Sequence, residues 1–150
     1  MEYGYSTILL INMEDSPSIN RFTDVFEEKG FSLYHVKTFE EAYQILGSQS
    51  VQIIVINMDT DYAKAFRFCY RVKHNQNLKH IFLIALSGAH SELGIYIEAQ
   101  TAEAKKWLNC DLFIPKPLNA MYLYKLLKKE IAILKGIDGT ALDTEKEPWL

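Results

Sequence analysis

Short apolar runs alternate with longer segments of helical period along this chain. Five of the runs have the length and the composition of β-strands. They cover residues 8–11, 31–36, 51–56, 81–86 and 112–114. The third and fourth runs are apolar at consecutive positions, as in strands whose two faces are both covered by helices. The pattern therefore predicts a parallel sheet with helices on both sides.

Helix start and stop signals lie between the runs. Ser16 followed by Pro17 predicts the start of a first helix, and Gly30 predicts its end. Thr38 and Glu41 have the spacing of a capping box, which predicts a second helix up to about residue 47. These signals place two helices between the first three strands.

Two further helices are predicted from apolar stripes at helical spacing. One spans about residues 61–74 and the other about residues 118–135. The expected stripe of the first is Phe66, Cys69, Tyr70 and Lys73. The expected stripe of the second is Leu123, Leu127, Ile131 and Leu134.

The alternation of strands and helices predicts an α/β fold with three layers, a doubly wound five-stranded parallel sheet between helices. The domain is expected to cover residues 1–136. Residues 137–150 are mostly polar and are expected to form a C-terminal tail. Trp149 and Leu150 at its end leave docking onto another surface as the alternative to a frayed terminus.

Composition and charge exclude several classes of protein. A chain of 150 residues with 49% hydrophobic side chains has the content of one globular domain. Its apolar runs are far shorter than the roughly 20 residues of a membrane-spanning helix, and its net charge of −3 gives no electrostatic basis for binding nucleic acid. Cys69 and Cys110 form no paired motif, and no secretion signal precedes them, so a cytoplasmic location is expected.

Residues with useful chemistry follow the predicted strands. In an open parallel sheet the ligand site lies beyond the carboxyl ends of the strands, where the strand order reverses. The residues found at these ends are Glu14, Asp15, Asn57, Asp59, Asp61, Ser87 and Lys116. Acids, an amide, a hydroxyl and a lysine are therefore expected to converge on one edge of the sheet.

This set of residues resembles the receiver domain of two-component response regulators, the CheY-like family, over about residues 6–135. The matching stretches are residues 8–17, 51–57, 81–88 and 111–118. The separations from Glu14 to Asn57 and from Asn57 to Ser87 also match the spacing of that family. The resemblance implies a flavodoxin-like sheet with strand order 2-1-3-4-5 and a role in signalling.

In that family an aspartate at the end of the third strand accepts a phosphoryl group, and an acidic pair after the first strand holds Mg²⁺. A serine or threonine hydroxyl and a lysine then bind the phosphoryl oxygens. The resemblance places Ser87 and Lys116 at these two positions. It places Phe113 at the position of an aromatic residue that swings with the switch hydroxyl.

The chain departs from the family at the chemical step. Asn57 stands where the phosphoaccepting aspartate is expected, and the nitrogen of a carboxamide is a very poor nucleophile. An ungapped alignment places Met13 and Glu14 at the acidic pair, whereas a small shift would make Glu14 and Asp15 the pair. A thioether is a poor ligand for Mg²⁺. These departures predict a pseudo-receiver without a cofactor, a protein-interaction module that does not depend on phosphorylation.

Two alternatives remain at this point. Phosphorylation or Mg²⁺ binding could proceed through displaced acids, namely Glu14, Asp15 and Asp59, although Asp59 and Asp61 also suit a turn and a helix N-cap. The other alternative is an enzyme or a nucleotide-binding protein on the same kind of sheet. No glycine-rich phosphate loop follows the first strand and no GxSxG motif occurs, so we expect no enzymatic activity.

The segment between Ser87 and Lys116 is longer than is usual for the family by roughly seven residues, about two helical turns. The extra length falls in residues 88–109, beside the surface that the fourth helix, fifth strand and fifth helix form in receivers. That surface is the expected binding face for a protein partner or for a second copy in a homodimer. The aromatic residues expected there are Tyr96, Trp107, Tyr122 and Tyr124, with a core position as the alternative for Trp107 and Tyr124.

Overall fold

The structure is a computed structural model that describes residues 7–11, 16–59, 61–88, 109–116 and 118–130. Residues 89–108, most of the expected extended segment, and residues 137–150, the expected tail, lie outside the described ranges. The same holds for the expected domain boundary at residue 136. None of the helices within the described ranges is long and apolar enough to cross a membrane.

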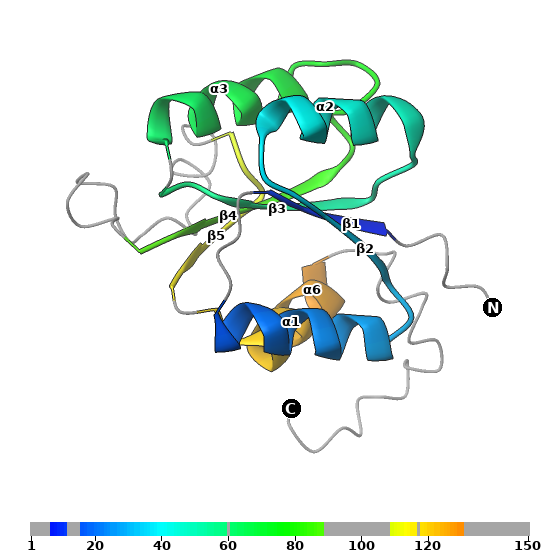
Figure 1. The fold of residues 1–150 in the computed structure, drawn as a ribbon, viewed down its shortest axis with the longest axis vertical. Coiled ribbons are helices and arrows are strands. Elements are labelled where there is room, and N and C mark those ends of the chain that lie inside the picture. The colour runs from blue at the N-terminus through cyan, green and yellow to red at the C-terminus, as the bar shows by residue number, and fades with distance from the viewer. Residues whose placement is uncertain (1–6, 12–15, 60, 89–108, 117, 131–150) are drawn as a thin grey trace.

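Five parallel strands form one sheet at the centre of the molecule (Figure 1). They are β1 (Thr7–Ile11), β2 (Ser32–Val36), β3 (Ile53–Asn57), β4 (Phe82–Ser87) and β5 (Leu112–Pro115). Their spatial order is β2-β1-β3-β4-β5, which confirms the predicted fold class and strand order. The order reverses between β1 and β3, so a ligand site is expected at the carboxyl ends of the central strands.

Helices cover both faces of this sheet. They are α1 (Pro17–Glu28), α2 (Phe39–Ser48), α3 (Tyr62–Lys73) and α6 (Ala120–Glu130). In Figure 1, α1 and α6 lie on one face and α2 and α3 lie on the other. Because both faces are covered, neighbouring residues of a central strand enter different cores: Ile8 and Leu10 pack with α1 and α6, whereas Leu9 and Ile11 pack with α2 and α3.

Side-chain oxygens cap the N-termini of three of the helices, as the sequence predicts. Each accepts a hydrogen bond from a backbone N–H that the helix itself leaves without a partner. The bonds are Ser16 Oγ from Ile19 N (3.2 Å), Thr38 Oγ1 from Glu41 N (3.1 Å) and Asp61 Oδ1 from Lys64 N (3.1 Å). The reciprocal bond of the capping box is displaced by one residue, because Glu41 Oε1 accepts from Lys37 N at 2.8 Å instead of from Thr38 N.

The end of α1 is also where the sequence predicts it. Gly30 has a φ of 97°, in the left-handed region that side chains rarely adopt. This conformation lets Gly30 N donate to Glu27 O at 3.0 Å and Phe31 N donate to Phe26 O at 3.0 Å. The chain then reverses into β2 with the last carbonyl groups of the helix satisfied.

The buried face of α3 differs from the predicted one. The predicted stripe contained Phe66 and Tyr70, but Tyr70 is 53% exposed and Phe66 is only partly buried. The residues that face the core are Ala65, Phe68, Cys69 and Val72. Both stripes share Cys69 and both have helical spacing, so the choice between them depends on contacts with the sheet, which the sequence pattern of one helix does not contain.

Candidate functional site

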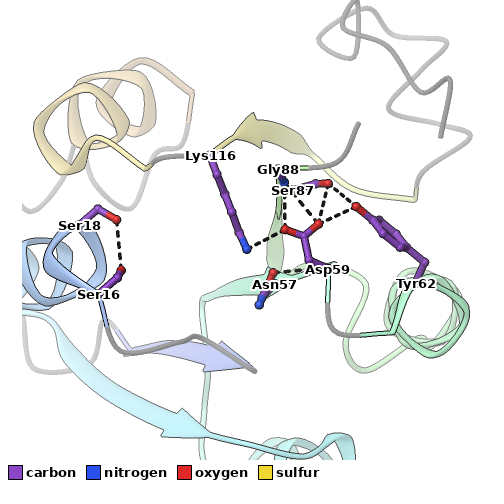
Figure 2. Close-up of polar contacts among 8 residues, drawn as sticks. All are labelled: Ser16, Ser18, Asn57, Asp59, Tyr62, Ser87, Gly88 and Lys116. Carbon is purple, nitrogen blue, oxygen red and sulfur yellow. Dashed lines mark hydrogen bonds and ion pairs between the residues drawn. The ribbon is translucent and has the colours of Figure 1, made fainter. Parts of the chain in front are cut away.

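The carboxyl ends of β3, β4 and β5 bring the predicted site residues together. Asn57 is the last residue of β3, Ser87 is the last residue of β4, and Lys116 directly follows β5. The parallel register pairs Asn57 with Leu86, and Lys116 N donates to Ser87 O at 3.0 Å. Three segments that are far apart in the sequence therefore meet at one edge of the sheet, together with Asp59 from the loop after β3 (Figure 2).

The carboxylate of Asp59 lies at the centre of this group. Its Oδ2 is 2.7 Å from Nζ of Lys116 and accepts a hydrogen bond from Gly88 N at 3.0 Å. Its Oδ1 accepts from Oγ of Ser87 at 3.0 Å. Figure 2 shows the Lys116 side chain reaching from β5 to this carboxylate. The lysine and the hydroxyl that the family resemblance assigns to phosphoryl binding both contact Asp59.

Tyr62, the first residue of α3, closes the other side of the carboxylate. Its hydroxyl donates to Oδ1 of Asp59 at 2.5 Å and lies 2.6 Å from Oγ of Ser87. Neither Tyr62 nor the backbone N–H of Gly88 is among the residues predicted for the site from the sequence. The one signal for Tyr62 was its place three residues after Asp59 at a helix start, which is too common to indicate a site.

Asn57 is buried at the base of the site and is 2% exposed. Its Oδ1 accepts a hydrogen bond from the backbone N of Asp59 at 3.1 Å. This is the side-chain-to-backbone bond of an Asx turn, in which an asparagine stabilises the bend two residues further on. Asn57 therefore has a structural role here, because it fixes the loop that carries Asp59.

The environment of Asp59 favours its charged form. Partial burial acts to raise the pKa of the carboxyl, but the hydrogen bonds that it accepts act more strongly in the other direction. The donors, in order of their effect, are Lys116, Tyr62, the N–H of Gly88 and Ser87. Together they lower the pKa of Asp59 from 3.8 to about 2, so the group is a carboxylate at neutral pH.

Two roles were expected for Asp59, a displaced phosphoacceptor or metal ligand and a turn residue. Neither describes this arrangement completely. Asp61 is the N-cap of α3, as expected, but Asp59 is more than a turn residue because its carboxylate joins β4, β5 and α3. Glu14 and Asp15, the other candidate metal ligands, lie outside the described residues. Across the ranges that the structure describes, no group of three acidic, histidine or cysteine side chains is placed to hold a metal ion.

Gly88 approaches the ion pair closely. A Cβ atom added at Gly88 would lie 3.3 Å from Cδ of Lys116 and 3.5 Å from Oδ2 of Asp59. Larger side chains at this position would push the lysine away from the carboxylate. Gly88, the residue after Ser87, therefore contributes both a hydrogen-bond donor and the space for Lys116.

The candidate interaction residues have different surroundings. Tyr122 on α6 is 55% exposed, as a surface anchor requires. Tyr124 is a core residue instead, 1% exposed, with its ring edge-on to Phe26 at 5.5 Å. Alternate faces of a helix explain the difference, because residues two apart point about 200° away from each other. Phe113 is buried in the core on the face of the sheet that α2 and α3 cover, and Tyr96 and Trp107 lie outside the described residues.

Solved structures of two response regulators and of one uncharacterized protein share this fold. One is a two-component response regulator from Clostridium difficile, with a TM-score of 0.64 and 22% identity over 87% of this chain and 96% of that chain. An uncharacterized protein from Neptuniibacter caesariensis has a TM-score of 0.67 and 19% identity over 98% of both chains. An atypical orphan response regulator protein has a TM-score of 0.60 and 17% identity over 86% of this chain and 95% of that chain.

No family model matches the sequence, and a search of curated proteins finds no match either. The likeness therefore lies in the fold: the order of the strands, their parallel pairing and the helices on both faces. The chain has the CheY-like fold of response-regulator receiver domains.

Proposed function

We propose that this chain is an atypical receiver domain of two-component-type signalling, which acts as a protein-interaction module without being phosphorylated. The observation that carries the proposal is that the Asp59 carboxylate contacts Lys116 and Ser87, the side chains expected to bind a phosphoryl group. Because a carboxylate of the chain itself makes these contacts, Lys116 and Ser87 have an anionic partner without a transferred phosphoryl group. We therefore assign a binding role and no catalytic role to the chain.

The chemistry of Asn57 supports the same conclusion. Formation of an aspartyl phosphate requires a carboxylate oxygen that attacks phosphorus. Asn57, at the end of β3, offers an amide oxygen and an amide nitrogen whose lone pair is delocalised, and its oxygen accepts a bond from the backbone of Asp59. The expected phosphoacceptor position therefore holds no effective nucleophile.

The contacts of Asp59 speak against the alternative in which displaced acids take over. Both carboxylate oxygens of Asp59 are already engaged, Oδ2 by Lys116 and Oδ1 by the hydroxyls of Ser87 and Tyr62, so an oxygen that attacked phosphorus would first have to give up such contacts. A Mg²⁺ ion bound to Asp59 would share its carboxylate with the ammonium group of Lys116, so each cation would weaken the binding of the other. The site favours a carboxylate that stays where it is over one that reacts or binds a metal ion.

A relative of the same fold provides a precedent. The atypical orphan response regulator protein named above has a phosphorylation-independent regulatory mechanism. At 17% identity it shares the fold with this chain, and the precedent is that a receiver fold can regulate without phosphorylation.

We assign the partner-binding face to the side of the molecule that carries β5 and α6, with a protein or a second copy of the chain as the partner. Tyr122 on α6 supports this assignment because a large aromatic side chain that is 55% exposed is a typical interface anchor. The net charge of −3 favours neither nucleic acid nor an anionic membrane as the partner. Two buried free cysteines, Cys69 and Cys110, agree with a reducing, cytoplasmic location.

The test is incubation with Mg²⁺ and acetyl phosphate followed by measurement of the intact mass. The wild-type chain is expected to keep its mass, while a phosphorylatable receiver domain in the same tube shows that the phosphodonor is active. A stoichiometric, hydroxylamine-labile adduct on the wild-type chain would contradict the proposal. Loss of that adduct in Asp59→Asn would then assign it to the displaced acid.

A further inference from the structure

Four donors converge on one carboxylate at the edge of the sheet (Figure 2). They are Nζ of Lys116 (2.7 Å), the hydroxyl of Tyr62 (2.5 Å), N of Gly88 (3.0 Å) and Oγ of Ser87 (3.0 Å). A full positive charge, two hydroxyls and a backbone N–H are the groups that bind oxyanions in proteins. Ser87 ends β4, Gly88 and Lys116 follow β4 and β5, and Tyr62 begins α3. The arrangement is therefore assembled by the fold and not by one local segment.

We propose that these groups form an oxyanion site whose resident ligand is the side chain of Asp59, and that inorganic phosphate enters the site only when this carboxylate is removed. The inference rests on the proposed function, because it names what replaces the phosphoryl group. It adds that the site is occupied from within and is thereby closed to free anions.

The covalent attachment of Asp59 to the loop after β3 explains why its carboxylate outcompetes a free phosphate ion for the site. Asp59 follows Asn57 by two residues, and the bond from Asp59 N to Asn57 Oδ1 at 3.1 Å holds the loop in the required bend. A ligand tethered by a short loop has an effective concentration of the order of millimolar or more. It also loses no translational freedom on binding, which a free phosphate ion does.

Charge and space add to this advantage. With a pKa of about 2, Asp59 is ionised at every pH at which phosphate is a physiological anion. On the side of Gly88 the site is tight, because even a methyl group there would lie 3.3 Å from Cδ of Lys116 and 3.5 Å from Oδ2 of Asp59. Phosphate beside the carboxylate would be repelled by its like charge. To enter the site, phosphate would therefore have to displace the carboxylate.

The experiment compares inorganic phosphate with chloride at equal ionic strength, using the melting temperature and the NMR signal of the Gly88 amide. For Asp59→Ala, phosphate is expected to raise the melting temperature in a saturable manner, with a dissociation constant of the order of millimolar, and to shift the Gly88 signal. Wild type is expected to respond at least about tenfold more weakly. The double variant Asp59→Ala, Lys116→Met is expected to lose the response because it lacks the cation.

Two results would overturn the inference. One is phosphate binding by wild type that is as tight as binding by Asp59→Ala, since the carboxylate would then not occupy the site. The other is a folded Asp59→Ala, judged by circular dichroism, that does not bind phosphate. Should Asp59→Ala fail to fold, Asp59→Ser also removes the carboxylate and leaves room for phosphate, and the same two results apply to it.

The outcome is separable from that of the proposed function. A wild-type chain that accepts a phosphoryl group from acetyl phosphate would contradict the proposed function itself. A wild-type chain that stays unmodified, together with an Asp59→Ala variant that ignores phosphate, would contradict only the internal-ligand inference.

Discussion

Asn57 and Asp59 divide between them two properties that a phosphorylated aspartate combines. Asn57 occupies the position at the end of β3, and Asp59 supplies the negative charge to Lys116 and Ser87. The Asx bond between the two residues makes this division work, because it turns the backbone so that the second side chain reaches the site of the first. Under the proposed function, the site at the residue scale has kept its charge pairing and has lost its reaction.

The first prediction concerns the pH dependence of stability. The pKa of Asp59 is about 2 in the folded chain against an ordinary 3.8, so its contribution to stability is full above about pH 4 and is lost as the pH falls toward 2. The shift corresponds to about 2 kcal/mol, which solvent screening at this partly exposed pair reduces to about 1 kcal/mol. Asp59→Asn should therefore be less stable than wild type at pH 7 by about 1 kcal/mol, and the difference should vanish between pH 4 and pH 2. Urea denaturation at a series of pH values measures it, and a difference that is constant over this range would refute the role assigned to the charge.

The second prediction concerns the hydroxyl of Tyr62. Tyr62→Phe removes the bond to Asp59 Oδ1 and the contact with Ser87 while it keeps the ring, so a loss of about 1 kcal/mol in the free energy of unfolding is expected. Tyr70→Phe is the matched control on the same helix, because Tyr70 is 53% exposed, and it should change stability by less than about 0.5 kcal/mol. Chemical denaturation compares them, and equal losses would show that the Tyr62 hydroxyl is not part of a network around Asp59.

At the scale of elements, an ion pair joins α3 to the opposite end of the sheet. Lys73 Nζ is 2.6 Å from Oδ2 of Asp111, which also accepts from Leu83 N at 2.8 Å. Lys73 Nζ donates in addition to Ile81 O at 2.7 Å. The last turn of α3 is thereby held to the segments that enter β4 and β5, and these are the strands whose far ends carry Ser87 and Lys116.

The third prediction tests this connection. Asp111→Asn should lower the free energy of unfolding by about 1–2 kcal/mol, because it removes the charge that pairs with Lys73 and weakens the bond to Leu83 N. Asp24→Asn, on the exposed side of α1, is the control and should stay within about 0.5 kcal/mol of wild type. Equilibrium denaturation in urea provides both values. A loss no larger than that of the control would mean that the ion pair contributes nothing to holding α3.

The elements that the sequence predicted correctly are those with local causes. The buried strands β3 and β4 are recognisable because consecutive apolar residues suit a strand covered on both faces, and the caps Ser16, Thr38 and Asp61 bond within three residues of themselves. The stripe of α3 was wrong because two apolar stripes of equal spacing exist on that helix. Only packing on the sheet selects between them.

The meeting of several candidate residues at one edge of the sheet was predicted, but the bonds that they form there were not. Asn57, Ser87 and Lys116 follow strands, so the topology alone brings them to one edge. The contact of Asp59 with Lys116 depends on the bend of one loop and on the reach of a lysine across the end of β5. Sequence spacing contains neither of these, which is also why Tyr62 and the N–H of Gly88 were missed.

On the scale of the whole molecule, the sheet separates two surfaces with different surroundings. The helices α1 and α6 cover one face, and α2 and α3 cover the other (Figure 1). Each surface carries one large exposed aromatic side chain among the described residues, Tyr122 on α6 and Tyr70 on α3. A comparison of these two tyrosines therefore tests which face of the molecule meets a partner.

The fourth prediction follows from the face proposed for binding. Tyr122→Ala should weaken self-association, or binding to an isolated partner, by about tenfold, which is the loss of about 1.4 kcal/mol expected for an aromatic anchor. Tyr70→Ala is the matched control, because its exposure of 53% is close to the 55% of Tyr122 on the other side of the sheet. Asn57→Asp should have a smaller effect than Tyr122→Ala. Sedimentation velocity or a binding titration measures all three, and equal effects would count against the α6 surface.

The carboxylate of Asp59 also determines how long the negative charge at this site lasts. An acyl phosphate is hydrolysed by water, so a phosphorylated receiver returns to its resting form at a rate that other proteins can change. The charge of Asp59 is attached through carbon–carbon bonds and persists for as long as the chain exists. Under the proposed function, the strength of the signal would then follow from how much of this protein is made and degraded, and a phosphatase would have nothing to remove.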